Sequence, residues 1–281
     1  MSRRAGGDRR TPGTAPVRRQ ILAMGGGGFT MQERSPALDQ LVLTLTAKAV
    51  PRICFLPTAS GDPREQVTRF HERFGEWPCE PSTLSLFHLG RDRIDPIEHL
   101  LTQDAIYVGG GSMRNMLAIW REHGIDDAMR VAWQSGTVLA GLSAGAMCWF
   151  AGGVSMSGGS PEAVAGLGLL DGSLSVHLGG ERRRMPVYRS AVASGVLPAG
   201  YALDDGAALV YEGTRLAQSV ASHPGARAVH VRRRRAGGTD EREVSLKLLP
   251  GARARGGSRL GRESSAVSEL RELRAGRHRW D

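Results

Sequence analysis

The sequence predicts an α/β fold of the doubly wound type, in which a mostly parallel sheet is flanked by helices within a single domain. Short apolar runs alternate with segments whose apolar residues recur at helical spacing, a pattern typical of parallel strands joined by helical crossovers. The chain has 281 residues, of which 41% are hydrophobic, and can bury a large core. Glycine-rich turns follow several apolar runs. Sites in open α/β sheets lie at such strand ends.

The two ends of the chain differ in charge from the residues between them. Residues 1–20 carry a net charge of +5 and residues 226–281 carry +8, out of +9 for the whole chain, so the residues between them carry −4. We expect a disordered basic leader at 1–18 and a disordered basic tail at 250–281, flanking a folded domain at 19–249. Because this domain is mildly acidic, nucleic acid is an unlikely partner.

The cysteines and the lengths of the apolar stretches indicate in which cellular compartment the protein is expected. No stretch approaches the roughly 18 consecutive apolar residues of a membrane span, and the N-terminus lacks the apolar core of a signal peptide. The three cysteines, Cys54, Cys79 and Cys148, are odd in number and lie in or beside apolar runs. This usage predicts reduced, buried thiols. We therefore expect a cytoplasmic protein without a membrane partner.

The first 140 residues supply the strands and helices of the predicted parallel sheet. The apolar runs predict strands at 19–24, 52–56, 84–87, 105–108 and 137–140. Helical spacing predicts helices at 36–49, 67–77, 94–101, 113–120 and 125–133. Pro36 suits the first turn of its helix, since that position needs no backbone N–H. The glycine run 25–28 lacks the G-x-G-x-x-G spacing, because the third glycine falls at Thr30. We therefore interpret the run as close backbone packing beneath an active site rather than a dinucleotide site.

The most informative stretch is the pentapeptide from Gly141 to Gly145, which follows an apolar run and precedes a segment, 146–150, that can continue as a buried helix. In the order strand, turn and helix, G-x-S-x-G is typical of a nucleophile elbow. Glycines on both sides allow the sharp turn that pushes out one side chain. Ser143 is therefore the candidate nucleophile.

A second glycine-rich turn, Gly109 to Gly111, follows the strand at 105–108. If this strand neighbours that of the elbow, backbone N–H groups of the triple glycine could meet the N–H of Ala144 around one oxyanion. A flexible loop is the alternative interpretation.

His177 is the candidate general base. Of the eight histidines, it alone ends an apolar strand downstream of Ser143. The order serine then histidine, with an acid between them, is that of α/β hydrolases. A hydrogen-bonded structural histidine is the alternative. Around it we expect a Gly/Ser-rich loop at 152–160, a helix at 187–196 and strands at 201–203, 207–211, 215–220 and 228–231.

These motifs resemble those of the peptidase E family of serine peptidases, which contains aspartyl dipeptidase and has cyanophycinase as a relative. The likeness runs from Ile21 to Val231 and is strongest in YVGGGSMRNMLAIW and VLAGLSAGAMCWF. The resemblance implies a class I glutamine-amidotransferase-like α/β fold. It also implies a serine-type dipeptidase that needs no cofactor or metal.

The resemblance also implies roles for individual residues. Ser143 would be the nucleophile and His177 its base, while Gly111 and Ala144 would supply the oxyanion N–H groups. Amidotransferases have cysteine at the elbow, so serine here argues against ammonia transfer from glutamine. Arg183 matches the arginine of a GE-x-R segment that would face an acidic substrate side chain. The expected partner is a short peptide, acidic peptides included, and a homodimer is left open.

The sequence departs from the family pattern in two places. The usual GGGN reads GGGS, with Ser112 in place of asparagine. The aspartate that these peptidases often carry after the elbow is replaced by Met156. The resemblance to cyanophycinase-like relatives favours Glu162 as the third triad member, with Asp171 as second choice. If neither acts, the protein is a catalytically silent relative that binds a peptide or small amide.

Overall fold

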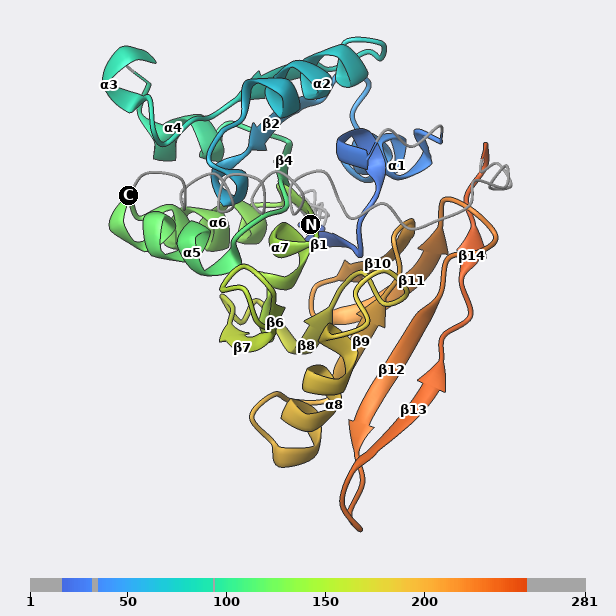
Figure 1. Cartoon of the computed structure of the whole chain (residues 1–281). Helices are drawn as coiled ribbons and strands as arrows, with labels where there is room; N and C mark the ends of the chain where they lie inside the picture. The colour runs from blue at the N-terminus through green and yellow to red at the C-terminus, as the bar shows by residue number, and fades with distance from the viewer. Residues whose placement is uncertain (1–16, 32–34, 93, 252–281) are drawn as a thin grey trace, which may run out of the picture.

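The computed structural model describes residues 17–31, 35–92 and 94–251 (Figure 1). Its larger sheet has eight strands in the order β14-β11-β10-β1-β5-β4-β2-β3. The five strands from β1 to β3 in this order are mutually parallel, whereas β10 runs antiparallel to β1. The strands are β1 (Gln20–Met24), β2 (Arg52–Leu56), β3 (Glu80–Thr83), β4 (Ala105–Val108), β5 (Val138–Leu142), β10 (Ala207–Glu212), β11 (Arg215–Ala221) and β14 (Lys247–Leu248).

Helices cover both faces of this sheet. Alternate residues of β1, β2, β4 and β5 pack against apolar residues of α5 and α6 on one face and of α1 and α2 on the other. The central strands are therefore buried on both sides, which is why they read as continuous apolar runs. The helices are α1 (Ala37–Leu45), α2 (Arg64–Phe74), α3 (Leu89–Asp92), α4 (Pro96–Leu101), α5 (Met113–Glu122) and α6 (Ile125–Gln134).

A second sheet follows the elbow and has six strands in the order β13-β12-β9-β8-β6-β7. Its strands are β6 (Phe150–Ser155), β7 (Glu162–Ala165), β8 (Leu170–Ser175), β9 (Gly200–Leu203), β12 (Ala228–Arg233) and β13 (Thr239–Glu243). Helix α8 (Arg184–Ser194) packs on it through a small core that includes Tyr188 and Val231. The larger core cluster contains residues of both sheets. In Figure 1 the β12–β13 hairpin projects from the rest of the molecule.

The predicted fold class is confirmed, with one addition and three corrections. The sequence predicted one sheet, and the structure has two. Strand β3 lies at Glu80–Thr83, four residues before the predicted 84–87. The helix after the elbow, α7, spans only Ala144–Met147, because β6 begins at Phe150. Part of the predicted loop 152–160 belongs to β6, where a Cβ on Gly153 would lie 2.4 Å from the carbonyl oxygen of Leu174. Glycine there serves close strand packing.

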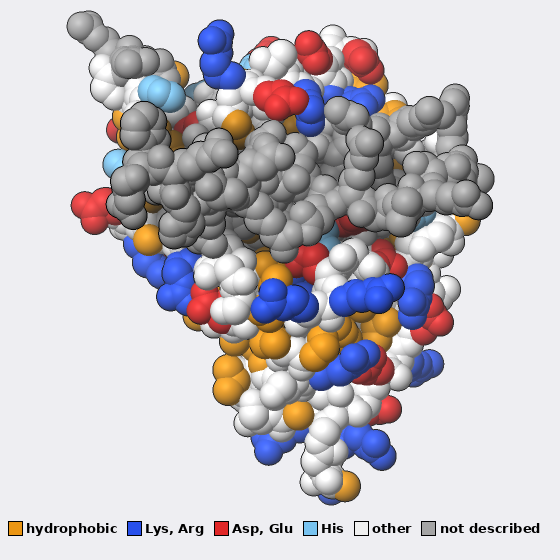
Figure 2. All heavy atoms as spheres, in the orientation of Figure 1, with side chains coloured by type: hydrophobic (Ala, Val, Ile, Leu, Met, Phe, Trp, Pro, Cys, Tyr) orange, Lys and Arg blue, Asp and Glu red, His pale blue; other side chains and the backbone are white. Residues whose placement is uncertain are grey.

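The two ends of the chain are described only in part. The predicted leader and tail lie outside the described residues, apart from residues 17, 18, 250 and 251. Among the described residues, no helix is both long enough and apolar enough to cross a membrane. On the face shown in Figure 2, Lys and Arg side chains lie among Asp and Glu side chains. The Arg232–Asp240 pair, 2.9 Å apart on the β12–β13 hairpin, is one example of such mixing.

Candidate active site

Ser143 occupies a sharp turn between β5 and α7. Its backbone has φ 52° and ψ −114°, a conformation that a residue with a side chain rarely adopts. The flanking glycines permit this turn. A Cβ on Gly141 would lie 2.1 Å from the carbonyl oxygen of Gly145, and one on Gly145 would lie 2.4 Å from that of Val108. Ser143 is therefore held on a strained bend and is partly exposed.

His177 follows the end of β8 in the second sheet and meets Ser143 of the first. Its Nε2 lies 3.0 Å from the Ser143 Oγ. The His177 side chain is 10% exposed, and its backbone, with φ 55°, is also left-handed. The structure thus brings together the two residues that the sequence singled out as nucleophile and base.

Asp205 completes the hydrogen-bonded chain. It lies in the turn between β9 and β10, and its Oδ1 is 2.5 Å from the His177 Nδ1. Asp205 is not among the residues predicted from the sequence, because the order expected for α/β hydrolases puts the acid between the serine and the histidine, and Asp205 follows His177. The available signal was an acidic residue followed by glycine, Gly206, at the end of an apolar strand.

The structure corrects the expected third member of the triad. Glu162, on β7, pairs with Arg114 of α5 at 2.9 Å, whereas the carboxylate at the imidazole is that of Asp205. Asp171 is exposed near the start of β8, at the end of the strand opposite His177. Met156 directly follows β6. Although this position holds no acid, the imidazole has a carboxylate partner in Asp205.

The glycine run after β1 packs directly against this chain of side chains. A Cβ on Gly26 would lie 2.1 Å from Oδ1 of Asp205 and 3.0 Å from Cε1 of His177. The Ser143 backbone N–H also donates to the Met24 carbonyl, at 3.1 Å. The close backbone packing expected for the glycine run is therefore confirmed.

The turn Gly109 to Gly111 lies beside Ser143. A Cβ on Gly110 would be 3.2 Å from the Ser143 Cβ. Gly111 has φ 137°, and the next residue, Ser112, donates its N–H to the Ala59 carbonyl at 2.7 Å. In the described part of the chain, the N–H groups of Gly111 and Ala144 have no hydrogen-bond acceptor. Both can therefore bind an oxyanion.

Ser112 shows what the departure from GGGN does to this turn. Its Oγ accepts from the Asn115 N–H at 3.2 Å, which caps α5. The same hydroxyl donates to the Ser157 Oγ at 3.1 Å. The glycine turn is thus fixed to both α5 and the loop after β6.

The triple arginine run divides into exposed and buried side chains. Arg183 is exposed at the N-cap of α8. Arg184 is buried, pairs with Glu181 at 2.8 Å and donates from Nη1 to the Val176 carbonyl at 3.4 Å. Burial lowers the pKa of Arg184, although Glu181 and then Asp205 act in the opposite direction. The buried cation therefore contributes to the field at the Asp205 carboxylate.

Of the three cysteines, Cys148 lies nearest to Ser143 in the sequence. Cys148 is fully buried one helical turn past Ser143, and burial raises the pKa of its thiol well above the usual value. A thiolate nucleophile there is disfavoured. Of the other two cysteines, Cys54 is buried and Cys79 is partly exposed, and all three are free thiols. Within the described ranges, no three His, Cys, Asp or Glu side chains gather as metal ligands would.

A family model and a curated relative each match most of this chain. The family model described as Peptidase family S51 matches residues 21–219. The Uncharacterized peptidase YgaJ of Bacillus subtilis (strain 168) is 46% identical over 213 residues, which cover 76% of this chain and 92% of that protein.

Two solved structures have the same fold at low identity. One is the crystal structure of a peptidase from an acI-B1 Actinobacterium, with a TM-score of 0.64 and 16% identity, covering 82% of this chain and 96% of that one. The other is a putative peptidase E protein from Listeria monocytogenes EGD-e, with a TM-score of 0.53 and 16% identity, covering 71% and 97%.

Proposed function

Because this chain belongs to peptidase family S51, we propose that it is a serine-type peptidase that hydrolyses short peptides through an acyl-enzyme on Ser143. The observation that carries this proposal is the continuous chain of contacts from the Ser143 Oγ through the His177 ring to the Asp205 carboxylate. This arrangement is the one that activates a serine hydroxyl in hydrolases on several unrelated folds.

The first step is proton removal from the nucleophile. Neutral His177 donates its Nδ1–H to Asp205, which leaves the Nε2 lone pair facing the Ser143 hydroxyl. As Ser143 attacks the peptide carbonyl, Nε2 takes the hydroxyl proton. The Asp205 carboxylate stabilises the imidazolium that forms and fixes the ring in the correct tautomer.

The second step is stabilisation of the tetrahedral intermediate. The N–H groups of Gly111 and Ala144 lie on two turns that meet beside Ser143 and have no protein acceptor among the described residues. Two such donors aimed at one oxyanion would each lower the barrier by about 3–4 kcal/mol. The imidazolium then gives its proton to the leaving amine, and water releases the acyl-enzyme by the same steps in reverse order.

The substrate we propose is a short peptide, with acidic side chains recognised by Arg183. This arginine is exposed at the N-cap of α8, six residues past His177 in the sequence, whereas Arg184 is already paired with Glu181. An exposed guanidinium suits a carboxylate. Replacing Arg183 by glutamine should then raise KM for peptides with Asp or Glu and leave peptides without them unaffected.

The alternative is a catalytically silent protein that binds a peptide or small amide. It rested on Met156 at the position of the family aspartate, which left the imidazole without an acid. With the Asp205 carboxylate 2.5 Å from the ring, that reason no longer applies.

A fluorophosphonate probe tests the proposal, because it reacts with activated serines and needs no knowledge of the substrate. Native protein should be labelled within minutes, and Ser143→Ala should not be labelled. Hydrolysis of a dipeptide and tripeptide panel should disappear in the same variant. Folded native protein that neither labels nor hydrolyses any of these peptides would refute the peptidase proposal.

A further inference from the structure

We propose that Asp204, the neighbour of Asp205, is a positioning residue that holds the turn carrying His177. This inference rests on the proposed function, since the turn matters only if His177 acts as the base. The Asp204 carboxylate accepts hydrogen bonds from backbone N–H groups and none from the Ser143 hydroxyl or the imidazole among the described residues. It acts through the backbone on which the imidazole is mounted.

The Asp204 carboxylate bridges two loops. Its Oδ1 accepts from the N–H of Gly179, two residues after His177, at 2.6 Å. Its Oδ2 accepts from the N–H of Arg227, at the start of β12, at 3.1 Å. Hydrogen bonds from N–H groups to an ionised carboxylate are stronger than those between neutral groups. One side chain thus ties the His177 turn to the loop that leads into β12.

The His177 turn needs such a restraint. The left-handed backbone at His177 is unfavourable for a residue with a side chain and persists only when surrounding contacts fix it. Within the turn, the N–H groups of Gly180 and Glu181 donate to the His177 carbonyl at 3.1 and 3.0 Å. These bonds define the turn but do not attach it to the segment that carries Asp205. The Asp204 side chain adds an attachment to that segment through the Gly179 N–H.

The backbone around Asp204 strengthens the link. Its N–H donates to the Arg227 carbonyl at 2.9 Å, and its carbonyl accepts from the Ala207 N–H at 3.1 Å. The Leu178 N–H donates to the Leu203 carbonyl at 3.0 Å. The Gly179–Asp204 hydrogen bond and the Leu178–Leu203 backbone bond together join segments 177–179 and 203–205.

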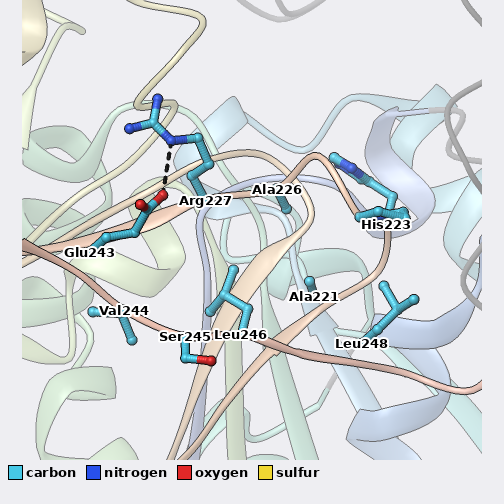
Figure 3. A pocket seen from close by; sticks show the side chains of 10 residues that line it. Ala221, His223, Ala226, Arg227, Glu243, Val244, Ser245, Leu246 and Leu248 are labelled. Carbon is cyan, nitrogen blue, oxygen red and sulfur yellow. Dashed lines mark hydrogen bonds and ion pairs between the residues drawn. The ribbon is translucent and has the colours of Figure 1, made fainter.

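A cavity of about 490 Å³, shown in Figure 3, is lined in part by Arg227, the residue whose N–H bonds to Asp204. His223 lines the cavity, and its Nε2–H donates to the Asp205 carbonyl at 3.1 Å. The Arg227 side chain is directed to Glu243, 3.4 Å away, while its backbone N–H serves Asp204. His223 thus fixes the backbone of the acid, and Asp204 fixes the backbone of the base relative to it.

Two substitutions separate this role from a general structural one. Asp204→Asn keeps the size of the side chain but has one carbonyl oxygen, so it can accept from only one of the two N–H groups. Asp204→Ala removes both bonds. Asp127→Asn, an exposed aspartate in the first turn of α6, is the matched control for the loss of one negative charge.

The experiment measures fluorophosphonate labelling of Ser143 over a range of probe concentrations, which separates the limiting labelling rate from the probe concentration at half-saturation. We expect the limiting rate to fall about tenfold in Asp204→Asn and about 100-fold in Asp204→Ala, at unchanged half-saturation. Asp127→Asn should stay within about twofold of native protein. The graded loss identifies the carboxylate bonds, because simple destabilisation does not change the limiting rate of folded molecules.

The outcomes are distinct. Native limiting rates in both Asp204 variants would overturn the positioning role while leaving the peptidase proposal intact. A changed half-saturation with a native limiting rate would overturn it too, because that result assigns Asp204 to the probe contact. If Asp204→Ala fails to fold by circular dichroism, Asp204→Asn alone decides. Absence of labelling in native protein would instead refute the peptidase function itself, and with it this role.

Discussion

The Nδ1 of His177 lies 2.5 Å from Oδ1 of Asp205, although the two residues are 28 positions apart in the chain. This contact predicts the effect of removing the acid. Asp205→Asn should lower kcat by about 10⁴-fold, because an amide favours the wrong tautomer of the imidazole and cannot stabilise its cation. The measurement is peptide hydrolysis at pH 7 to 8, with the probe labelling rate as a second readout.

Glu162→Gln distinguishes this assignment from the one made from sequence. Its carboxylate pairs with Arg114 in a partly exposed ion pair, which contributes little. We expect kcat within about threefold of native protein. The opposite ranking, with a large loss in Glu162→Gln and a small one in Asp205→Asn, would return the third triad position to Glu162.

A methyl group at Gly26 should disable the site without unfolding the protein. The added Cβ would lie 2.1 Å from Oδ1 of Asp205 and 3.0 Å from His177, so the pair must move apart. A shift of this size should reduce kcat/KM by about 100-fold. Gly90→Ala is the control, because no atom lies within 4 Å of its added Cβ. Native activity in Gly26→Ala would mean that the glycine loop yields easily and does not hold the pair.

Asp104 predicts a dependence of stability on pH. Burial raises the pKa of this carboxyl, but the Lys48 ammonium at 2.6 Å and the Arg52 N–H at 2.9 Å outweigh it and lower the pKa below the usual 3.8. A carboxyl with a lower pKa in the folded chain stabilises the protein above the unfolded pKa, and this contribution is lost as the pH falls through the folded pKa.

Asp104→Asn should therefore lower Tm at pH 7 by about 2–4 °C, and the difference from native protein should shrink toward pH 3. Asp240→Asn, which breaks the exposed pair with Arg232, should have a smaller effect. Equal Tm differences at pH 7 and pH 3 would show that Asp104 acts without its charge. Scanning calorimetry across this pH range makes the comparison.

Thiol reagents should leave the activity intact. Burial raises the pKa of Cys148 well above its usual value, and that of Cys54 to about 12, so neither thiol ionises near neutral pH. Cys79 is partly exposed and should be alkylated first. Iodoacetamide should modify Cys79, as mass spectrometry would reveal, with little loss of peptide hydrolysis. Rapid inactivation that tracks modification of Cys148 would argue for thiol chemistry.

The strands of the larger sheet could be predicted where the sequence has a local pattern of apolar residues. Strands β1, β2, β4 and β5 are buried on both faces and appear as apolar runs. The second sheet was hidden because β6 carries glycines that serve close packing and β13 is an exposed, charged strand. Both features resemble loops when the sequence is considered alone.

The candidate site divides in the same way. The spacing of glycine and serine predicts Ser143 and the glycine turns, and the position at the end of an apolar strand predicts His177. Asp205 depends on the pairing of β9 with β8, which brings its turn next to His177. That proximity arises from long-range strand order. The resemblance to cyanophycinase-like relatives favoured Glu162 instead, and Asp171 was the second choice.

The three members of the proposed triad come from three different parts of the fold. Ser143 follows a strand of the eight-stranded sheet, His177 follows a strand of the six-stranded sheet, and Asp205 lies on the connection that crosses from one to the other. Neither sheet carries the whole triad, so Ser143 gains its base and its acid only where the two sheets are packed together. Labelling by a serine-directed probe should therefore report on the packing of the two sheets as well as on the serine itself.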